Sequence, residues 1–309
     1  MKLFLGVDGG QSGTTAVVGD ESGRVIGVGR GGPCNHVGKA EGRAKFLNAV
    51  GGCLRESGFG GAHFEAVCMG FSGGAEDKDA YVRELIHAEH YLITHDAAIA
   101  LTGATAGEAG VIVIAGTGSI AFGRNAQGKM ARAGGWGYVF GDEGGGFDLA
   151  RQALRSALRE EEGWGPKTRL RADLLNATCA SSANDLLHRC YTDEYPRERV
   201  ATLSRLVDEA ARAGDAVALE ILHAAAQQLA VIAGAARGQI FSAGEPCRVC
   251  YIGGVFRSET LLARFRMLVE LTDGNRVTAP EYGPAAGALI EAYRLAGVNV
   301  TLKEVPLEK

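Results

Sequence analysis

The chain has 309 residues, of which 46% are hydrophobic and 22% are charged, and its net charge is −4. This is the composition of an ordinary globular protein, and the length suits two domains of about 100–200 residues each. The lack of a basic excess argues against a nucleic acid or an anionic membrane as a partner, because there is too little lysine and arginine to neutralise their phosphates.

The sequence indicates no targeting segment and no membrane span. The first residues lead directly into a predicted strand and lack the apolar core of a signal peptide. No apolar run reaches about 18 residues. The seven cysteines are odd in number and irregular in spacing, which favours reduced thiols. We therefore expect a cytoplasmic protein.

The first half of the chain alternates strand-like and helix-like segments, as judged from apolar spacing and glycine-rich turns. Strands are predicted, in chain order, at residues 3–7, 15–19, 24–29, 66–71 and 91–94, and helices at residues 40–57, 79–88 and 96–106. The resulting order is βββαβαβα.

The second half repeats this order with a longer helical block. Strands are predicted at residues 111–115, 120–124, 129–133, 250–252 and 276–278, and helices at about 148–238, 258–271 and 284–295. The repeat predicts an α/β fold of two similar domains, 1–109 and 110–309, with the last helix free to pack back on the first domain. Because ligands of such sheets bind beyond the carboxyl ends of the strands, we expect the glycine turns to converge on one cleft.

A glycine-rich turn, DGGQSGT at residues 8–14, follows the first predicted strand. Glycines such as Gly10 permit a tight turn and let backbone N–H groups face an anion, while the hydroxyls of Ser12 and Thr14 add donors for phosphate. A carboxylate beside bound phosphates needs a cation between them, which makes Asp8 a candidate for Mg²⁺, held through water. An ordinary hairpin turn is the alternative explanation of the same residues.

A second glycine turn, AGTGS at residues 115–119, occupies the matching position in the second half. Gly116, Thr117 and Gly118 again combine bare backbone with a hydroxyl. Two such turns at equivalent points of a repeat are less expected by chance than one, so we predict that they hold the phosphates of ATP. Neither turn is a Walker A loop, because no Gly-Lys-Ser/Thr sequence occurs.

Asp96 is the candidate catalytic base. It follows the predicted strand at 91–94, where a carboxylate could take the proton of a substrate hydroxyl as that hydroxyl attacks phosphorus. The alternative is that Asp96 only caps the next helix.

The most distinctive stretch is GGWGYVFGDEGGG at residues 134–146. Its carboxylates, Asp142 and Glu143, can accept paired bonds from neighbouring hydroxyls, and Trp136 can supply an apolar wall. Such a loop suits a polyhydroxylated ligand. A flexible loop whose acidic pair favours a helix N-terminus is the alternative.

Three weaker positions complete the candidate site. Asn35 could contribute an amide to the same ligand, and Gly253-Gly254 could let an adenine or ribose pack on bare backbone. Each is also explained as a plain turn. Cys247 and Cys250 form a CxxC with no second pair, so we do not expect a metal or redox role for them.

Taken in order, these motifs resemble the two phosphate elements, the sugar loop and the adenosine element of actin-like ATPase sugar kinases. Within that superfamily the chain resembles the N-acetylglucosamine kinase and BadF/BadG-type ATPase family over residues 3 to 295. The loop at 134–146 with the upstream HDAA at 95–98 is the specific part. The resemblance implies transfer of the ATP γ-phosphoryl group, with Mg²⁺, to an amino sugar or N-acetyl amino sugar of the N-acetylglucosamine, glucosamine or N-acetylmuramic acid type.

The resemblance also implies roles for individual residues. Asp8 matches the acidic residue near Mg²⁺, and Asp96 matches the base that contacts the acceptor hydroxyl. The implied nucleotide contacts are Ser12, Thr117, Gly214 and Gly253. The implied sugar contacts are Asn35, Asp96, Ser119, Ile120, Gly135, Trp136, Gly137 and Asp142.

Two other functions are consistent with the same family. It includes activators of acyl-CoA dehydratases and reductases, which bridge two subunits with an iron–sulfur cluster, but Cys34 and Cys68 do not resemble their cysteine pattern. A non-catalytic sugar sensor is disfavoured because Asp8 and Asp96 are both present. The long helical block suggests a homodimer.

Overall fold

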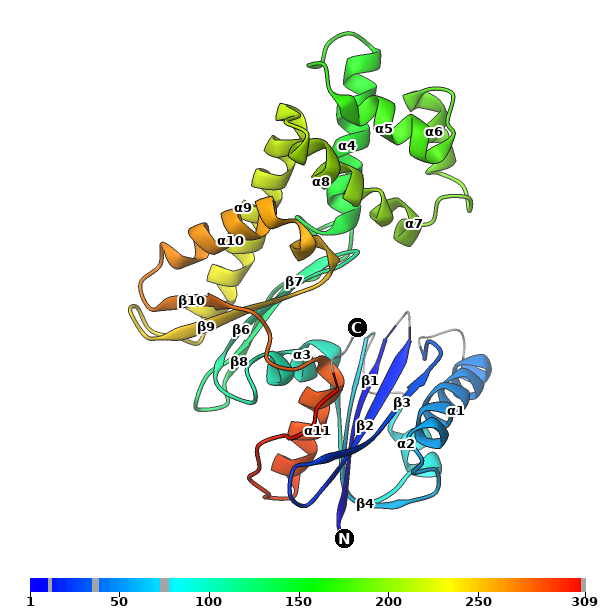
Figure 1. The fold of residues 1–309 in the computed structure, drawn as a ribbon, viewed down its shortest axis with the longest axis vertical. Coiled ribbons are helices and arrows are strands. Elements are labelled where there is room, and N and C mark those ends of the chain that lie inside the picture. Colours follow the sequence, from blue (N-terminus) through cyan, green and yellow to red (C-terminus); the bar gives the residue numbers. More distant parts are fainter. Residues whose placement is uncertain (11–12, 35–38, 73–77, 307–309) are drawn as a thin grey trace. The chain divides into compact units, whose positions relative to one another are not determined.

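The computed structural model describes residues 1–10, 13–34, 39–72 and 78–306. The chain divides into two compact units, one of Met1–Gly110 with Ala279–Lys309 and the other of Val111–Thr278. In Figure 1 the first unit carries the blue and cyan segments with the red C-terminal helix, and the second unit runs from green to orange. The chain therefore passes between the units twice, and its last helix belongs with the first unit.

The first unit is built on a five-stranded mixed sheet of order β3-β2-β1-β4-β5. Its elements are β1 (Leu3–Gly9), β2 (Thr14–Asp20), β3 (Val25–Gly31), α1 (Lys39–Glu56), β4 (His63–Phe71), α2 (Asp79–Leu85), β5 (His87–His95), α3 (Asp96–Ala104) and α11 (Pro284–Leu295). Strands β1, β4 and β5 are parallel, whereas β2 and β3 form antiparallel pairs. The three parallel strands consequently end at one edge of the sheet.

Helices cover both faces of this sheet, which is why its central strand is apolar on both sides. Leu5 and Val7 of β1 pack in one core with Phe46 of α1. Phe4, which lies on the opposite face, packs in the other core with Leu289 of α11. The run of apolar residues in β1 thus follows from burial on two sides.

Helices α3 and α11 pack with almost no space between their backbones. A Cβ placed on Gly287 would lie 2.8 Å from the Cα of Gly103 and closer still to the carbonyl oxygen of Ile99. A Cβ on Gly6 of β1 would lie 2.7 Å from the Cα of Leu289. The missing side chains at Gly6 and Gly287 let α11 pack against the sheet and α3 together.

The second unit repeats the first sheet. Its strands are β6 (Gly110–Ala115), β7 (Ser119–Arg124), β8 (Met130–Gly134), β9 (Cys247–Ile252) and β10 (Asn275–Thr278). Their order, β10-β9-β6-β7-β8, is that of the first sheet read in reverse, with β6, β9 and β10 parallel. The predicted α/β fold of two repeated units is therefore confirmed.

The predicted helical block between β8 and β9 consists of six helices. They are α4 (Gly146–Glu161), α5 (Arg169–Thr178), α6 (Ala183–Arg189), α7 (Arg197–Thr202), α8 (Ser204–Arg212) and α9 (Ala216–Gly238), and α10 (Glu259–Glu270) follows β9. Helix α4 buries Leu149, Ala153 and Ala157 along one face, as expected of an amphipathic helix. Figure 1 shows α4, α5 and α6 extending beyond the end of the second sheet.

Helix α9 is the one helix in the described part of the chain that is long and apolar enough to cross a membrane, with a mean hydropathy of 1.5. It packs against α8, α10 and β7, and Leu222 and Leu229 are fully buried there. The core helix of a globular unit passes the same test of length and composition, and α9 is such a helix in this fold.

Some elements differ from the sequence prediction in length. Strand β5 begins at His87 although it was expected at residue 91, because an edge strand tolerates the polar residues that precede Tyr91. Helix α2 ends early, since Ile86 has extended backbone angles (φ −126°, ψ 129°) and leads directly into β5.

Candidate functional site

The first unit brings Asp8 and Asp96 to the same edge of its sheet. Asp8 in β1 lies opposite Gly70 in β4, and Gly70 lies opposite Thr94 in β5, two residues before Asp96. Neighbouring strands lie about 4.8 Å apart, so roughly two strand spacings separate the two carboxylates along the edge. Both residues are half-buried. The parallel strands thus place both predicted acidic residues where an α/β sheet binds ligands.

Asp96 is the first residue of α3, and the helix cap itself is His95, which makes no side-chain capping bond. One carboxylate oxygen, Oδ1, accepts a hydrogen bond of 2.7 Å from the backbone N–H of Ala97. Asp96 is therefore not the helix cap that was given above as the alternative, and this contact is local to the first turn of α3. It uses one oxygen, and Oδ2 makes no bond to any residue that the structure describes.

The first glycine turn is stabilised by its own backbone. The N–H of Gly10 donates to the carbonyl of Gly13 at 2.9 Å, and the N–H of Cys34 donates to the carbonyl of Gly10 at 3.4 Å. Thr14 is buried, and its hydroxyl donates to the carbonyl of Gly32 at 2.8 Å. That hydroxyl is therefore engaged within the unit. Ser12, the other predicted hydroxyl, lies outside the described residues, as does Asn35.

The residues near Asp8 are compatible with a magnesium ion that takes most of its ligands from phosphates and water. Among the described residues, no three His, Cys, Asp or Glu side chains gather as a metal site. Mg²⁺ commonly takes only one or two carboxylates from a protein and completes its shell with phosphate oxygens and water. A single carboxylate at a strand end satisfies that requirement.

In the second unit, the start of α4 packs directly on the second glycine turn. The N–H of Gly146 donates to the carbonyl of Gly116 at 2.8 Å, and the N–H of Phe147 donates to the carbonyl of Thr117 at 3.0 Å. A Cβ on Gly145 would lie 2.8 Å from the Cα of Gly118. The loop at 134–146 therefore ends against the turn at 116–118, although about 30 residues separate them in sequence.

Asp142 lies at the centre of this arrangement. It is buried and has a positive φ of 63°, a conformation that non-glycine residues rarely adopt. Its carboxylate forms an ion pair with Arg197 of α7. A Cβ on Gly118 would lie only 2.5 Å from the Asp142 Cγ. Bare backbone at Gly118 thus makes room for the carboxylate.

The other predicted sugar-binding residues join the same region. The Ser119 hydroxyl donates to the carbonyl of Glu143 at 2.6 Å, and the N–H of Gly135 donates to the carbonyl of Ser119 at 3.0 Å. Gly135 packs so closely on Ile120 that a Cβ there would lie 2.8 Å from the isoleucine Cδ1. Ser119, Ile120, Gly135 and Asp142 therefore lie in one region of the second unit.

Trp136 presents an open apolar surface. Its side chain is 71% exposed, and the Arg132 guanidinium lies over the indole at 5.0 Å from the ring. Gly135 and Gly137 on either side have positive φ of 71° and 82°. Glycine at both positions allows the tight backbone that holds the ring outward.

Asp148, which the sequence analysis did not single out, holds the end of the loop. Its Oδ2 accepts from the N–H of Gly144 at 3.0 Å, and its Oδ1 accepts from Arg151 at 2.7 Å. The residue is buried in the first turn of α4. An acidic residue at a helix start was the one available signal.

The predicted adenosine element borders a cavity of about 270 Å³. Gly253 has a φ of 116°, and a Cβ there would lie 2.5 Å from the carbonyl carbon of Ala115. Gly254 lines the cavity with Ser204 and Asp208 of α8. The Asp208 Oδ1 is buried without a hydrogen-bond partner among the described residues.

Gly214 lies in the turn after α8 and does not line this cavity, whereas Arg212, two residues earlier, does. The approach of α8 to Gly254 was not visible in sequence, because nothing in the α8 pattern indicates its partner.

Cys247 and Cys250 are both buried in β9, and burial raises the pKa of the Cys247 thiol to about 11. A thiol in that state is unreactive.

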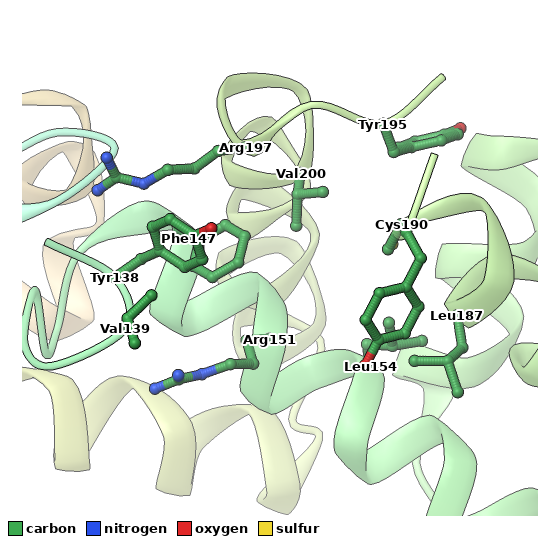
Figure 2. A pocket seen from close by; sticks show the side chains of 11 residues that line it. Tyr138, Val139, Phe147, Arg151, Leu154, Leu187, Cys190, Tyr195, Arg197 and Val200 are labelled. Atoms are coloured by element: carbon green, nitrogen blue, oxygen red, sulfur yellow. The ribbon is translucent and has the colours of Figure 1, made fainter. Parts of the chain in front are cut away.

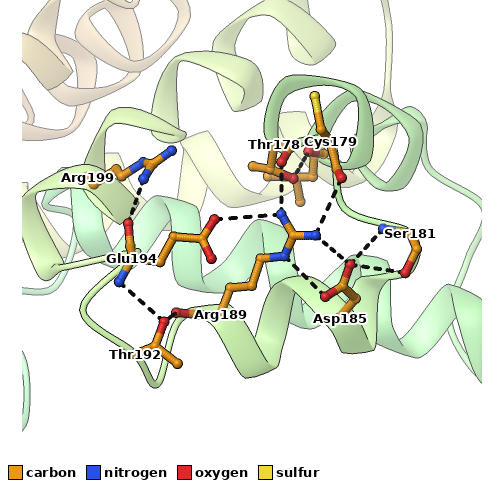
Figure 3. A network of polar contacts seen from close by, with 9 residues as sticks. Thr178, Cys179, Ser181, Asp185, Arg189, Thr192, Glu194 and Arg199 are labelled. Carbon is orange, nitrogen blue, oxygen red and sulfur yellow. Dashed lines mark hydrogen bonds and ion pairs between the residues drawn. The ribbon is translucent and has the colours of Figure 1, made fainter.

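A polar network holds in place the chain segment that precedes Arg197 (Figure 3). Arg189 of α6 pairs with Asp185 at 2.8 Å and with Glu194 at 3.7 Å. It also donates to the carbonyl of Thr178 at 3.3 Å. One guanidinium thus ties the end of α5 to α6 and to the residues that lead into α7.

This network makes a prediction about pH. The hydrogen bonds from Arg189 and then Ser181 lower the pKa of Asp185 from 3.8 to about 2. A folded pKa below the unfolded one means that the stabilisation is complete above about pH 4 and is lost as the pH falls through about 2. We expect an NMR titration of the Asp185 carboxyl to give a midpoint near 2, and Arg189→Met to raise it toward 3.8. An unchanged midpoint in that variant would remove Arg189 as the cause.

The two repeated units, each with a glycine turn after its first strand, define the class of actin-like ATPases. The fold is similar to that of a candidate N-acetylglucosamine kinase from Chromobacterium violaceum, with a TM-score of 0.74 and 26% identity over 94% of this chain and 98% of the other. It also matches a ROK family glucokinase from Streptomyces griseus, with a TM-score of 0.56 and 18% identity over 96% and 99%, a likeness of fold alone.

The chain belongs to the BadF/BadG/BcrA/BcrD ATPase family, whose family model matches residues 5–292. It is 35% identical over 236 residues to an N-acetylmuramic acid/N-acetylglucosamine kinase from Clostridium acetobutylicum. It is 32% identical over 246 residues to an N-acetyl-D-glucosamine kinase from Dictyostelium discoideum. Each match spans 74% of this chain and 77% of the relative. The family predicted from the motifs is confirmed.

Proposed function

We propose that this protein phosphorylates a hydroxyl of an amino sugar or N-acetyl amino sugar at the expense of ATP. The observation that carries the proposal is the packing of the loop at 134–146 on the turn at 116–118, which brings Ser119 and Asp142 beside the phosphate turn. The two kinases described above, at 35% and 32% identity, support the substrate class.

Asp96 acts as the general base in this proposal. With Oδ1 held by the N–H of Ala97, the carboxylate is oriented, and Oδ2 accepts the proton of the sugar hydroxyl as it attacks the γ-phosphorus. The new O–P bond forms as the bond to the β-phosphate oxygen breaks, and ADP leaves. Because phosphoryl transfer needs little covalent help from a protein, positioning of the hydroxyl is the main contribution of the sugar-binding residues.

In the second unit, the nucleotide would contact the glycine turn at 115–119 and the cavity beside Gly254. Asp8 would hold Mg²⁺ through water, and the ion would neutralise charge on the phosphates. Thr117 and Gly253 follow the nucleotide contacts that the family resemblance implies, and Gly116 adds bare backbone at the phosphate turn. We propose a cytoplasmic location without a membrane or nucleic-acid partner, and a homodimer.

The direct test is ADP release measured over a panel of glucosamine, N-acetylglucosamine and N-acetylmuramic acid, with a control that lacks sugar. We expect release to require one of these sugars and to yield an equal amount of sugar phosphate. ATP hydrolysis that is indifferent to every sugar would overturn the kinase proposal and favour the activator function instead.

Alanine substitutions at Gly116 and Gly118, in the same turn, distinguish an effect on nucleotide binding from an effect on the stability of the fold. A Cβ on Gly116 would meet no atom within 4 Å, whereas on Gly118 it would lie 2.5 Å from Asp142 and 2.9 Å from Arg197. We expect Gly118→Ala to lower the free energy of unfolding by about 1–3 kcal/mol through overpacking. Gly116→Ala should leave it within about 0.5 kcal/mol.

The open side of Gly116 is where the proposal puts phosphate. Gly116→Ala should therefore weaken binding of a non-hydrolysable ATP analogue by about tenfold or more, because bare backbone is what lets phosphate approach. Calorimetric titration measures the binding, and thermal unfolding measures the stability. Unchanged binding in Gly116→Ala would count against a phosphate at this turn.

A further inference from the structure

A groove of about 430 Å³ in the second unit is not used by the function proposed above. Figure 2 shows it running along one face of α4, where Phe147, Arg151 and Leu154 follow one another at helical spacing. Leu187 and Val200 close it from α6 and α7. The volume falls in the range of small-molecule sites, about 300–1,000 Å³.

The groove begins at the loop at 134–146. Tyr138 and Val139 of that loop form its near end, and the Tyr138 ring lies 5.1 Å from the Phe147 ring. Arg197 also lines the groove, and it is the residue whose guanidinium pairs with Asp142. The Arg197 side chain therefore links the groove to Asp142, the carboxylate that we propose binds the sugar.

Arg197 retains hydrogen-bond donors for a ligand. Its side chain is 30% exposed while it pairs with Asp142, and an arginine has five N–H donors. Its guanidinium carbon lies 5.2 Å from the Tyr138 ring centre, where the ring attracts the positive charge and helps to hold the side chain. Beyond this point the walls are mainly apolar, with Leu154, Leu187 and Val200.

We propose that this groove is a subsite for the N-acyl group of the amino sugar and accepts acyl chains longer than acetyl. The amide carbonyl would accept a hydrogen bond from Arg197, and the chain would lie along α4 toward Leu154. This inference rests on the proposed kinase function.

The test compares turnover of N-acetylglucosamine and N-hexanoylglucosamine by the full chain. We expect wild-type kcat/KM for the hexanoyl sugar to be within about tenfold of that for the acetyl sugar, since burial of the added methylenes offsets their ordering. Leu154→Trp, which fills the groove from a half-buried position, should lower the hexanoyl-to-acetyl ratio at least about tenfold.

The matched control is Leu158→Trp, one turn further along α4, at a residue that does not line the groove. It should keep the wild-type ratio. Equal ratios in all three proteins, or no turnover of the hexanoyl sugar by an enzyme active on the acetyl sugar, would overturn the groove proposal alone. Inactivity on every sugar would instead contradict the proposed function.

A second measurement does not depend on catalysis. Cys190 lines the groove, whereas Cys179 is exposed outside it. Bound N-hexanoylglucosamine should slow alkylation of Cys190 by iodoacetamide at least about threefold, because access controls thiol reactivity. Alkylation of Cys179 should not change, and N-acetylglucosamine should protect Cys190 less. Equal alkylation of Cys190 with and without the hexanoyl sugar would overturn the proposal even if the variants misfold.

Discussion

Asp96→Asn is expected to lower kcat for sugar phosphorylation by at least about 10²-fold, the lower end of what a general base contributes. The substituted amide keeps a carbonyl oxygen that can accept from the N–H of Ala97, so the start of α3 should stay intact. What it loses is the ability to take a proton. Steady-state assays with saturating sugar measure the effect, and titration with an ATP analogue should show retained binding.

Asp79→Asn is the matched control for this variant. Asp79 is also an aspartate at the first residue of a helix in the same unit, and its bond of 2.8 Å goes to Arg83. Turnover should remain within about twofold of wild type, because exposed pairs of this kind contribute little. If Asp96→Asn were as active as Asp79→Asn, Asp96 would have only the helix-start role.

Gly287→Ala should destabilise the first unit by about 3 kcal/mol or more. The new methyl group would be forced against backbone atoms of Ile99 and Gly103, which cannot turn aside as a side chain can. Overpacking of this kind typically costs about 1–3 kcal/mol, and rigid backbone on the other side puts this site at the upper end. Equilibrium denaturation in urea measures the loss.

Gly234→Ala, in the apolar helix α9, is expected to have the opposite effect on the free energy of unfolding. A Cβ on Gly234 in α9 would meet nothing within 4 Å. Replacing a helical glycine by alanine stabilises by about 0.4–1 kcal/mol when space allows. If both variants changed stability equally, close packing of α3 on α11 would not be the reason for glycine at position 287.

Local signals explain why much of the fold was predictable. Each glycine turn follows a buried strand, and the second half repeats the first, so the order of strands and helices along the chain and the positions of Asp8 and Asp96 near strand ends followed from the pattern. Strand ends were less predictable, because the polar start of β5 is permitted only by its place at the sheet edge.

Long-range partners could not be predicted in the same way. Asp142 stood out in the sequence, but its ion pair is made with Arg197, 55 residues away, in a helix whose own pattern indicates no partner. Ser204 and Asp208 join Gly254 only because α8 folds back to it. Such contacts depend on how the helical block packs, and a single sequence carries little information about that packing.

The return of the last helix to the first unit has a consequence for synthesis on the ribosome. The Phe4 ring lies 4.3 Å from that of Tyr293, whose hydroxyl donates to the Asp20 carbonyl at 2.6 Å, so one core joins segments that are made at very different times. At about 5–20 residues per second, the N-terminal sheet waits roughly 10–40 s for α11 with one apolar face covered only in part, by α3. The continuous second unit can complete its core earlier. Nascent chains stalled before residue 279 should therefore be the aggregation-prone species and the ones that need a chaperone.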